Sequence, residues 1–180
     1  MYTPAQLAHK NKEEVPMNSS QRRALLMEAK ATHTPLFSVE ELRAQLQQEN
    51  LPSRPEVQKI VAQTAALMGV NPKLAMGIAY IESGFNPAKV SDTGAIGPMQ
   101  LLPGAVSWAE KMVGRPLNMY SPRDNATAGV AILRYLQRHT DSTHNAIAAY
   151  YQGLRSLQND GAYPSTQKFV LRVLRAVSQL

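Results

Sequence analysis

The sequence contains no cysteine, and this absence excludes disulfide bonds, thiol catalysis and cysteine-ligated zinc. It has no apolar run near the roughly 20 residues that a membrane-spanning helix requires. Its first twenty residues carry polar and charged groups throughout, so no apolar stretch of about 7–15 residues is available as the core of a secretory signal. We therefore expect neither a transmembrane segment nor a signal peptide in this chain.

Alternation of β-branched and polar residues, the pattern of a β-strand, is also lacking, whereas the helical period recurs along the chain. Apolar residues make up 44% and charged residues 18% of the 180 positions, which is typical of a folded globular protein. A chain of this length holds one ordinary domain and an appendage. The sequence therefore predicts a mainly α fold with a single core.

The net charge of +6 favours association with polyanions, which include nucleic acid, anionic membrane surfaces and cell walls that bear carboxylates and phosphates. The positive sign of the charge does not distinguish among these three kinds of partner. A nucleic-acid-binding helix would concentrate Lys and Arg on one face. Here the basic residues are scattered from Lys10 to Arg175, which disfavours nucleic acid as the partner.

Two prolines mark a boundary in residues 51–55, which we interpret as a linker. Two short, charge-rich helical segments precede it, one near residues 20–31 and one that opens at Ser38. Each has a thin apolar stripe, enough to dock on a larger body but too little to form a core. We therefore predict an N-terminal helical extension over residues 1–54 and a larger domain over residues 55–180.

Helix start and stop signals are clear in several places. Glu41, three residues after Ser38, completes a capping-box pattern. Asn71-Pro72 supplies a capping side chain and a proline at the first helical position, and Gly84 ends that helix. Beyond residue 55 we expect helices over residues 57–69, with an apolar face of Val57, Ile60, Val61, Thr64 and Leu67, and over residues 71–83, 103–113, 121–138 and 145–151, with a last helix after Pro164.

Glu82 stands where an ionised acid is destabilised. It lies in the last turn of the helix predicted over residues 71–83, at the negative end of the helix dipole, and its neighbours Ile78, Ile81 and Phe85 are apolar. Both effects raise the pKa of the carboxyl group, and a carboxylic acid that stays protonated near neutral pH suits glycoside cleavage. A partly exposed glutamate at a helix end is the commoner case, so the local pattern leaves both interpretations open.

Around this residue the chain shows two ordered segments, Glu82-Ser83-Gly84-Phe85-Asn86-Pro87 and Gly94-Ala95-Ile96-Gly97-Pro98-Met99-Gln100-Leu101-Leu102-Pro103-Gly104. They resemble the catalytic signature of the soluble lytic transglycosylases, and residues 125–136, 148–153 and 166–174 are similar to later segments of that family. The similarity covers about Val57 to Leu174. It implies a lysozyme-like helical fold of the goose type and a peptidoglycan lytic transglycosylase activity in the domain.

The resemblance also implies roles for single residues. Glu82 becomes the general acid and then the general base, Ser91 and Gln100 become polar contacts of the bound muramyl sugar, and Tyr150 lies close to the catalytic carboxylate. Tyr150 and Tyr151 point about 100° apart on a helix, so at least one of them should face the cleft or solvent. The predicted substrate-binding residues are Ser91, Met99, Gln100, Tyr150 and Tyr151. No metal and no organic cofactor is expected.

Only one carboxyl group is well placed, whereas ordinary glycosidases use two. Asp92 is the nearest acid after Glu82, and the family pattern gives it no role. The resemblance implies that the substrate supplies the nucleophile at high effective concentration. The 6-hydroxyl of muramic acid then attacks the anomeric carbon, so that the MurNAc-GlcNAc β-1,4 bond breaks and a 1,6-anhydromuramyl product forms.

The sequence departs from the family pattern at Pro98, Leu102 and Tyr151-Gln152, and we expect these changes to alter glycan contacts. One alternative is a hydrolytic muramidase on the same fold, in which Asp92 or another acid positions water. Another is a non-catalytic wall-binding module of a phage particle or secretion machine, against which an intact Glu82 argues. The expected partner is peptidoglycan, and we expect the protein to act on it as a monomer. The expected place of action is the cell wall or periplasm, which the protein would reach by phage delivery, after trimming, or through export by a dedicated machine.

Several residues also have purely structural interpretations. Gly94 and Gly97 can serve only as turn residues, and Gln100 can tie down the loop through hydrogen bonds to backbone. We interpret Trp108 as a packing residue of an apolar helix. The four histidines match no metal-ligand spacing, and we expect them at the surface: His9, His33, His139 and His144.

Overall fold

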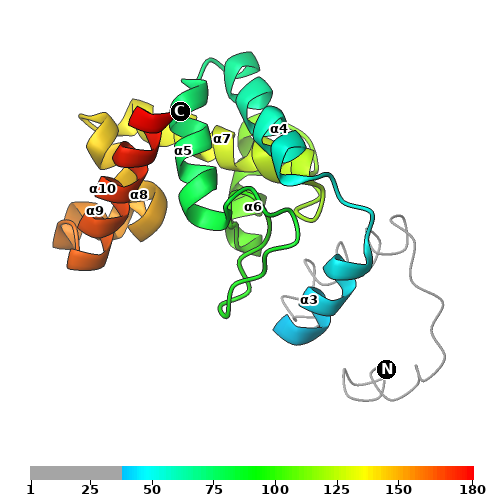
Figure 1. The fold of residues 1–180 in the computed structure, drawn as a ribbon. Coiled ribbons are helices and arrows are strands. Elements are labelled where there is room, and N and C mark those ends of the chain that lie inside the picture. The colour runs from blue at the N-terminus through cyan, green and yellow to red at the C-terminus, as the bar shows by residue number, and fades with distance from the viewer. Residues whose placement is uncertain (1–37) are drawn as a thin grey trace.

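The computed structural model describes residues 38–180, and Figure 1 shows how they fold. This part of the chain contains eight α-helices and isolated β-bridges without a strand, so the predicted mainly α class is confirmed. The helices are α3 (Val39–Gln48), α4 (Arg54–Leu67), α5 (Pro72–Ser83), α6 (Pro103–Val113), α7 (Pro122–His139), α8 (Thr143–Gln152), α9 (Leu154–Asp160) and α10 (Pro164–Gln179). The helix predicted near residues 20–31, together with His9 and His33, lies outside the described residues.

Helix α5 lies at the centre of the molecule and packs against both α4 and α10 (Figure 1). Gly77 permits the close approach of α10, because a Cβ atom at this position would lie 2.6 Å from the side chain of Val177. Helix α7 packs against α4, α6 and α8. The C-terminal end of α5 is therefore held by helices from the beginning and the end of the domain.

The core is formed mainly by aliphatic side chains of α4, α5, α7, α8 and α10. The largest fully buried side chains of these helices include Val57, Val61, Ile78, Val130, Leu133, Ile147, Val170 and Val173. Burial of one such side chain contributes about 1.5–3 kcal/mol relative to exposure. A well-packed core of this kind gives the end of α5 a rigid support.

The predicted start of α3 and both predicted ends of α5 agree with the structure. The Ser38 hydroxyl accepts a hydrogen bond from the Glu41 amide at 3.2 Å, and the Glu41 carboxylate accepts one from the Ser38 amide at 2.7 Å, which completes the predicted capping box. The Asn71 side chain caps α5 by accepting from the Lys73 amide at 2.9 Å, and Gly84 ends α5 with a φ of +60°. Local signals therefore set both ends of α5.

Two details of α4 differ from the prediction. The helix begins at Arg54, inside the segment interpreted as a linker, because Ser53 and Glu56 form a second capping box. Leu67, expected on the buried face, is 87% exposed. It is the last residue of α4, at the periphery of the domain, and the core continues through the buried Val70 after the turn.

Helix α9 is absent from the prediction because its seven residues lie between Gly153 and Gly161 and bury none of their side chains. Gln152, one of the departures from the family pattern, holds this connection together. Its side-chain amide donates to the Gly161 carbonyl at 2.8 Å. Its side-chain oxygen accepts from the Tyr163 amide at 3.1 Å and from the Thr166 hydroxyl at 2.7 Å. These bonds fix the path from α8 to α10.

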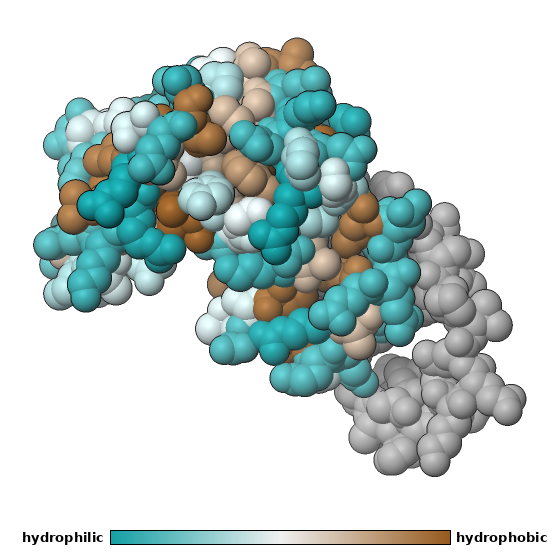
Figure 2. Space-filling model, viewed as in Figure 1, coloured by the Kyte–Doolittle hydropathy of each residue, from teal (hydrophilic) through white to brown (hydrophobic). Residues whose placement is uncertain are grey.

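The face of the molecule in Figure 2 is mostly hydrophilic, with separate apolar patches. It is notched between the part built from α8, α9 and α10 and the part that carries residues 84–102, which we call the α5–α6 loop (Figures 1 and 2). The C-terminal end of α5 lies beside this notch. Within residues 38–180, no helix has the length and apolarity that crossing a bilayer requires.

Candidate active site

Glu82 lies in the last turn of α5, where the chain turns into the α5–α6 loop. Burial of the side chain raises the pKa of its carboxyl group from 4.5 to about 7, against the opposing charges of Lys89 and Arg172. The predicted direction of this change is confirmed, and burial is its main cause. A carboxyl group with this pKa is protonated in about half of the molecules at neutral pH, so it can both donate and accept a proton.

The α5–α6 loop is held in shape by hydrogen bonds among its own residues. The Gly97 amide donates to the Lys89 carbonyl at 2.8 Å. The Gln100 side chain donates to the carbonyls of Lys89 and Gly97 at 3.2 and 3.0 Å. Gln100 also adopts a left-handed backbone conformation, with a φ of +51°, which these bonds hold in place. Gln100 therefore ties down the loop, in agreement with its structural interpretation.

Two contacts join the loop to the end of α5. The buried hydroxyl of Ser83 donates to the Pro98 carbonyl at 2.8 Å and also lies 3.1 Å from the Ala79 carbonyl of its own helix. The Lys89 ammonium donates a hydrogen bond to the backbone carbonyl of Glu82. These contacts come from the residues immediately around the acid, so the loop and Glu82 are held as one unit.

Asn125 of α7 holds the loop from the other side and is 0% exposed. Its side-chain amide donates to the carbonyls of Ile96 and Met119 at 2.9 and 3.1 Å. Its side-chain oxygen accepts from the Met99 amide at 2.9 Å. Gly97 leaves room for this side chain, because a Cβ atom there would lie 2.9 Å from the Asn125 amide nitrogen. One buried amide thus satisfies three backbone groups.

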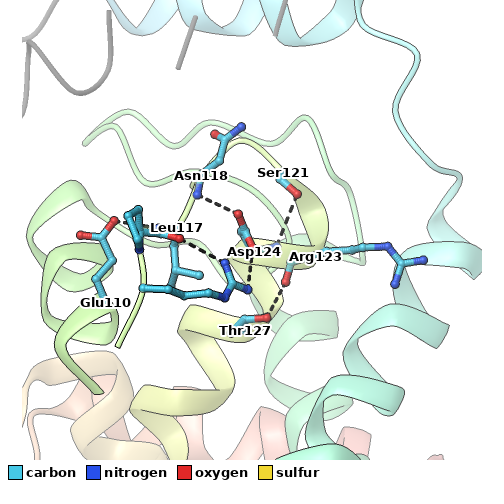
Figure 3. Close-up of polar contacts among 9 residues, drawn as sticks. Glu110, Leu117, Asn118, Ser121, Arg123, Asp124 and Thr127 are labelled. Carbon is cyan, nitrogen blue, oxygen red and sulfur yellow. Dashed lines mark hydrogen bonds and ion pairs between the residues drawn. The ribbon is translucent and has the colours of Figure 1, made fainter. Parts of the chain in front are cut away.

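The start of α7, and with it Asn125, is fixed by the neighbouring Asp124 (Figure 3). The Asp124 carboxylate accepts from the Arg115 guanidinium at 3.0 Å and from the Asn118 amide at 2.9 Å. The Asp124 amide donates to the hydroxyl of Ser121, the residue that caps α7. An acidic residue in the first turn also interacts favourably with the positive end of the helix dipole.

Met99 and Tyr150 connect α8 to the same loop. Met99 is 0% exposed and packs against Gly129, where a Cβ atom would lie 2.7 Å from its side chain. Its carbonyl accepts from the Tyr150 hydroxyl at 3.0 Å. Burial and the charge of Glu82 raise the pKa of Tyr150 well above its ordinary value, so this hydroxyl lies within electrostatic reach of the acid. The structure thus places the Met99 side chain in the core and the Tyr150 hydroxyl at the site.

The remaining predicted site residues, Ser91 and Tyr151, make other contacts. Ser91 turns its hydroxyl into the loop, where the oxygen accepts from the Ala95 amide at 2.9 Å. Tyr151 is 48% exposed and stacks on Phe169 of α10, with ring centroids 4.6 Å apart. Tyr151 is therefore the member of the tyrosine pair that faces solvent. Trp108 packs edge-on against an aromatic ring of α7 and is partly exposed.

Helix α3 also reaches the α5–α6 loop. The Arg43 guanidinium donates to the Val90 carbonyl at 3.1 Å through Nε and to the Asp92 carboxylate at 2.6 Å through Nη2. Asp92, the nearest acid in sequence, is thus engaged by an arginine at the surface. The predicted extension therefore contacts the loop that carries several predicted site residues.

Four residues that the structure brings to the site were not among the predicted site residues: Ser83, Lys89, Asn125 and Arg172. Ser83 and Asn125 lie inside the segments that carried the family resemblance. A polar residue on the otherwise apolar face of the amphipathic helix α7 is the signal that could have identified Asn125. Nothing in the local sequence distinguishes Lys89 and Arg172 from other basic residues.

The positions of the acidic and histidine side chains bear on whether the described residues could hold a metal ion. Among residues 38–180, no group of three or more His, Cys, Asp or Glu side chains is arranged to hold a metal ion. His139 and His144 are exposed, as predicted. His139 stacks on the ring of Tyr135 at a centroid distance of 3.8 Å.

Comparison with known protein families matches residues 59–172 to the model of the transglycosylase SLT domain. Among curated relatives, a membrane-bound lytic murein transglycosylase C of Glaesserella parasuis is 38% identical over 119 residues, which cover 56% of this chain and 33% of the relative. A transglycosylase of Enterobacteria phage PRD1 is 32% identical over 121 residues, which cover 67% of this chain and 42% of the phage protein.

Two solved structures have similar folds. The lytic transglycosylase Slt of Pseudomonas aeruginosa, solved as an inactive mutant, has a TM-score of 0.60 and 21% identity and covers 88% of this chain and 32% of its own. The 70 kDa soluble lytic transglycosylase of Escherichia coli has a TM-score of 0.60 and 20% identity, with 97% of this chain and 32% of its own covered. The predicted lysozyme-like helical fold is confirmed, and the chain spans about a third of these longer structures.

Proposed function

The chain belongs to the transglycosylase SLT family, and we propose that it cleaves the MurNAc-GlcNAc β-1,4 bond of peptidoglycan by lytic transglycosylation. The observation that carries this proposal is the partly buried Glu82 carboxyl, whose pKa of about 7 keeps a large fraction of it protonated at neutral pH. Glycoside cleavage requires such an acid, because the leaving oxygen must receive a proton as its bond breaks.

In the proposed reaction, Glu82 donates its proton to the glycosidic oxygen while the bond between that oxygen and the anomeric carbon breaks. The 6-hydroxyl oxygen of the same muramyl residue attacks the anomeric carbon, and the Glu82 carboxylate removes the proton from this hydroxyl. The products are a free 4-hydroxyl and a 1,6-anhydro ring, and Glu82 ends protonated as it began. Water is not consumed, and an intramolecular nucleophile gains its high effective concentration from the substrate itself.

The environment of Asp92 favours this reaction over hydrolysis. A muramidase on the same fold would need a second carboxylate to position water beside the anomeric carbon. The Asp92 side chain is 96% exposed and bound by Arg43 at the surface, so it is poorly suited to that role. Glu82 is then the single acid proposed to act at the site.

We propose that the glycan binds beside the α5–α6 loop and α8, with contacts from Ser91, Gln100, Tyr150 and Tyr151. The Ser91 and Gln100 side chains shape the loop through bonds to backbone, which supports a role in presenting loop groups to the sugar. The exposed ring of Tyr151 offers an apolar face for a sugar. Met99 contributes from the core, through the carbonyl that accepts from Tyr150.

We assign the catalytic domain to residues 55–180 and an N-terminal extension to residues 1–54, with a monomer acting on glycan strands in the cell wall or periplasm. The contact of α3 with the α5–α6 loop supports a role for the extension in holding that loop. The phage relative and the bacterial relative are both named transglycosylases. This supports transglycosylation as the reaction of this chain, whether a phage or a bacterium delivers it to the cell wall.

The test is mass spectrometry of fragments released from purified peptidoglycan by the parent protein, by Glu82→Gln and by Glu40→Gln. Glu40 is an exposed glutamate of α3 and serves as the matched control. We expect 1,6-anhydromuramyl products from the parent and from Glu40→Gln, and none from Glu82→Gln. Reducing muramyl ends from the parent would assign a hydrolase instead. No release by a folded parent would assign a binding module.

A further inference from the structure

The C-terminal end of α5 has backbone carbonyl groups without a partner inside the helix, as every helix end does. Cationic side chains from other segments meet this need. The Lys89 ammonium donates to the carbonyl of Glu82, and the Arg54 guanidinium donates to the carbonyl of Gly84 at 3.3 Å. Cations at this end also interact favourably with the helix dipole. Lys89 therefore caps α5 at the very residue that carries the acid.

Lys89 is bonded through its backbone as well. Its carbonyl accepts from the Gly97 amide at 2.8 Å and from the Gln100 side chain at 3.2 Å. The side chain of Lys89 thus holds the end of α5, while its backbone holds the two residues that shape the α5–α6 loop. Displacement of Lys89 would remove one of the two contacts that join the loop to the end of α5 and would leave only the bond between Ser83 and Pro98.

Charged and titratable groups reach Glu82 from three elements: Lys89 from the α5–α6 loop, Arg172 from α10 and the Tyr150 hydroxyl from α8. Arg172 is exposed, so solvent and salt weaken its field. Lys89 is half-buried, and its ammonium is anchored on the backbone of Glu82 itself. Its charge is therefore the one held at a constant position relative to the acid.

We infer that Lys89 is a positioning residue for the reaction, which fastens the α5–α6 loop to the end of α5 and supplies the positive charge that stabilises the Glu82 carboxylate after proton donation. The inference rests on the proposed role of Glu82. An ionised carboxylate is costly in an apolar setting, and a neighbouring cation lowers that cost. Burial and Lys89 act in opposite directions on the pKa of Glu82, and their balance lets one group serve as acid and then as base.

The test is the titration of Glu82 in the full chain, followed by carbon NMR of labelled glutamate side chains, with the resonance assigned by its loss in Glu82→Gln. We expect the pKa of Glu82 to be higher in Lys89→Met and in Lys89→Gln than in the parent, and to return toward the parent value in Lys89→Arg. Lys111→Met, at an exposed lysine of α6, is the matched control and should leave the pKa unchanged.

The glutamine variant keeps a donor for the Glu82 carbonyl without a charge, so it separates charge from capping and also supplies the test if Lys89→Met fails to fold. An unchanged pKa of Glu82 in Lys89→Gln, and in Lys89→Met where it folds, overturns the inference. Because the titration needs no substrate, it tests the role of Lys89 even if the parent releases no anhydro product, a result that would contradict only the proposed function. In the active protein, we expect the high-pH limb of the pH profile of kcat/KM to move to higher pH in Lys89→Met, because Glu82 stays protonated up to a higher pH.

Discussion

Gly97 and Asn125 fit together so closely that a Cβ atom on the glycine would lie 2.9 Å from the asparagine amide nitrogen. The glycine has a φ of +76°, a backbone conformation that L side chains rarely adopt. The Asn125 side chain fills the space and bonds to the backbone of the α5–α6 loop. This pair therefore joins the loop to the core helix α7.

Asn125→Ala should destabilise the protein strongly. The substitution leaves the Ile96 and Met119 carbonyls and the Met99 amide without their partner in a buried setting. Each unsatisfied group costs about 1–3 kcal/mol, so we expect a loss of roughly 3 kcal/mol or more in the free energy of unfolding. Denaturant unfolding measures it, with the exposed Asn159→Ala as control. A loss below about 1 kcal/mol would contradict the anchoring role, since it is less than one lost buried bond.

Glu82→Gln should make the protein more stable than the parent at high pH. In the folded protein the pKa of Glu82 is raised from 4.5 to about 7. Between about pH 4.5 and pH 7 the folded protein therefore holds a proton that the unfolded chain releases, so the parent loses stability as the pH rises through this window. Gln carries no ionisable group and escapes this loss. We expect no difference from this source below pH 4 and an advantage of up to about 3 kcal/mol above pH 8.

Thermal or denaturant unfolding at a series of pH values measures this advantage. Glu40→Gln, at an exposed glutamate, provides the control for the loss of a surface charge. A difference between parent and Glu82→Gln that stays constant from pH 4 to pH 8 would show that burial does not perturb the carboxyl.

Arg43→Ala should loosen the α5–α6 loop while the domain stays folded. The substitution removes both the bond to the Val90 carbonyl and the ion pair with Asp92. Exposed ion pairs contribute about 0.2–1 kcal/mol, so we expect amide hydrogen exchange in the loop to rise by roughly 1.5- to fivefold. Asp92→Asn keeps the Val90 contact and should show a smaller rise.

Native-state hydrogen exchange of residues 89–97 is the measurement. Arg138→Ala, at an exposed arginine of α7, supplies the matched control. Exchange rates in the loop that match the parent's in Arg43→Ala would mean that α3 does not hold the loop.

Tyr150→Phe should lower the catalytic rate without unfolding the domain. The variant keeps the ring but removes the hydroxyl that donates to the Met99 carbonyl beside Glu82. Loss of one partly buried hydrogen bond costs about 1–2 kcal/mol, which corresponds to a roughly tenfold fall in kcat/KM if the bond holds the reactive geometry. Initial rates of anhydro-product release test it. Tyr135→Phe, which keeps the ring contact with Trp108, should match the parent.

Short-range features of the fold were predictable because they depend on a few neighbouring residues. Ser38 and Glu41 form their capping box within one turn, and Asn71 and Gly84 bound α5 where the pattern placed them. The carboxyl of Glu82 has a raised pKa, as its apolar neighbours predicted. The prediction that Leu67 is buried was wrong. An apolar period identifies the face of a helix on which a residue lies, but it does not show whether the rest of the core extends as far as that end of the helix.

Spacing and local chemistry were enough to indicate the mainly α class and the ends of α5. Glu82 was identified as the candidate acid because the segments around it resemble a known family. Tertiary structure alone decided which distant residues support that acid. Tyr150 bonds to Met99 across 51 positions of sequence, and Asn125 bonds to Ile96 across 29. The packing of α5 against α10, of α10 against α8 and of α8 against α7 around one core creates these contacts. The exposed or buried state of a lysine or asparagine follows from that packing.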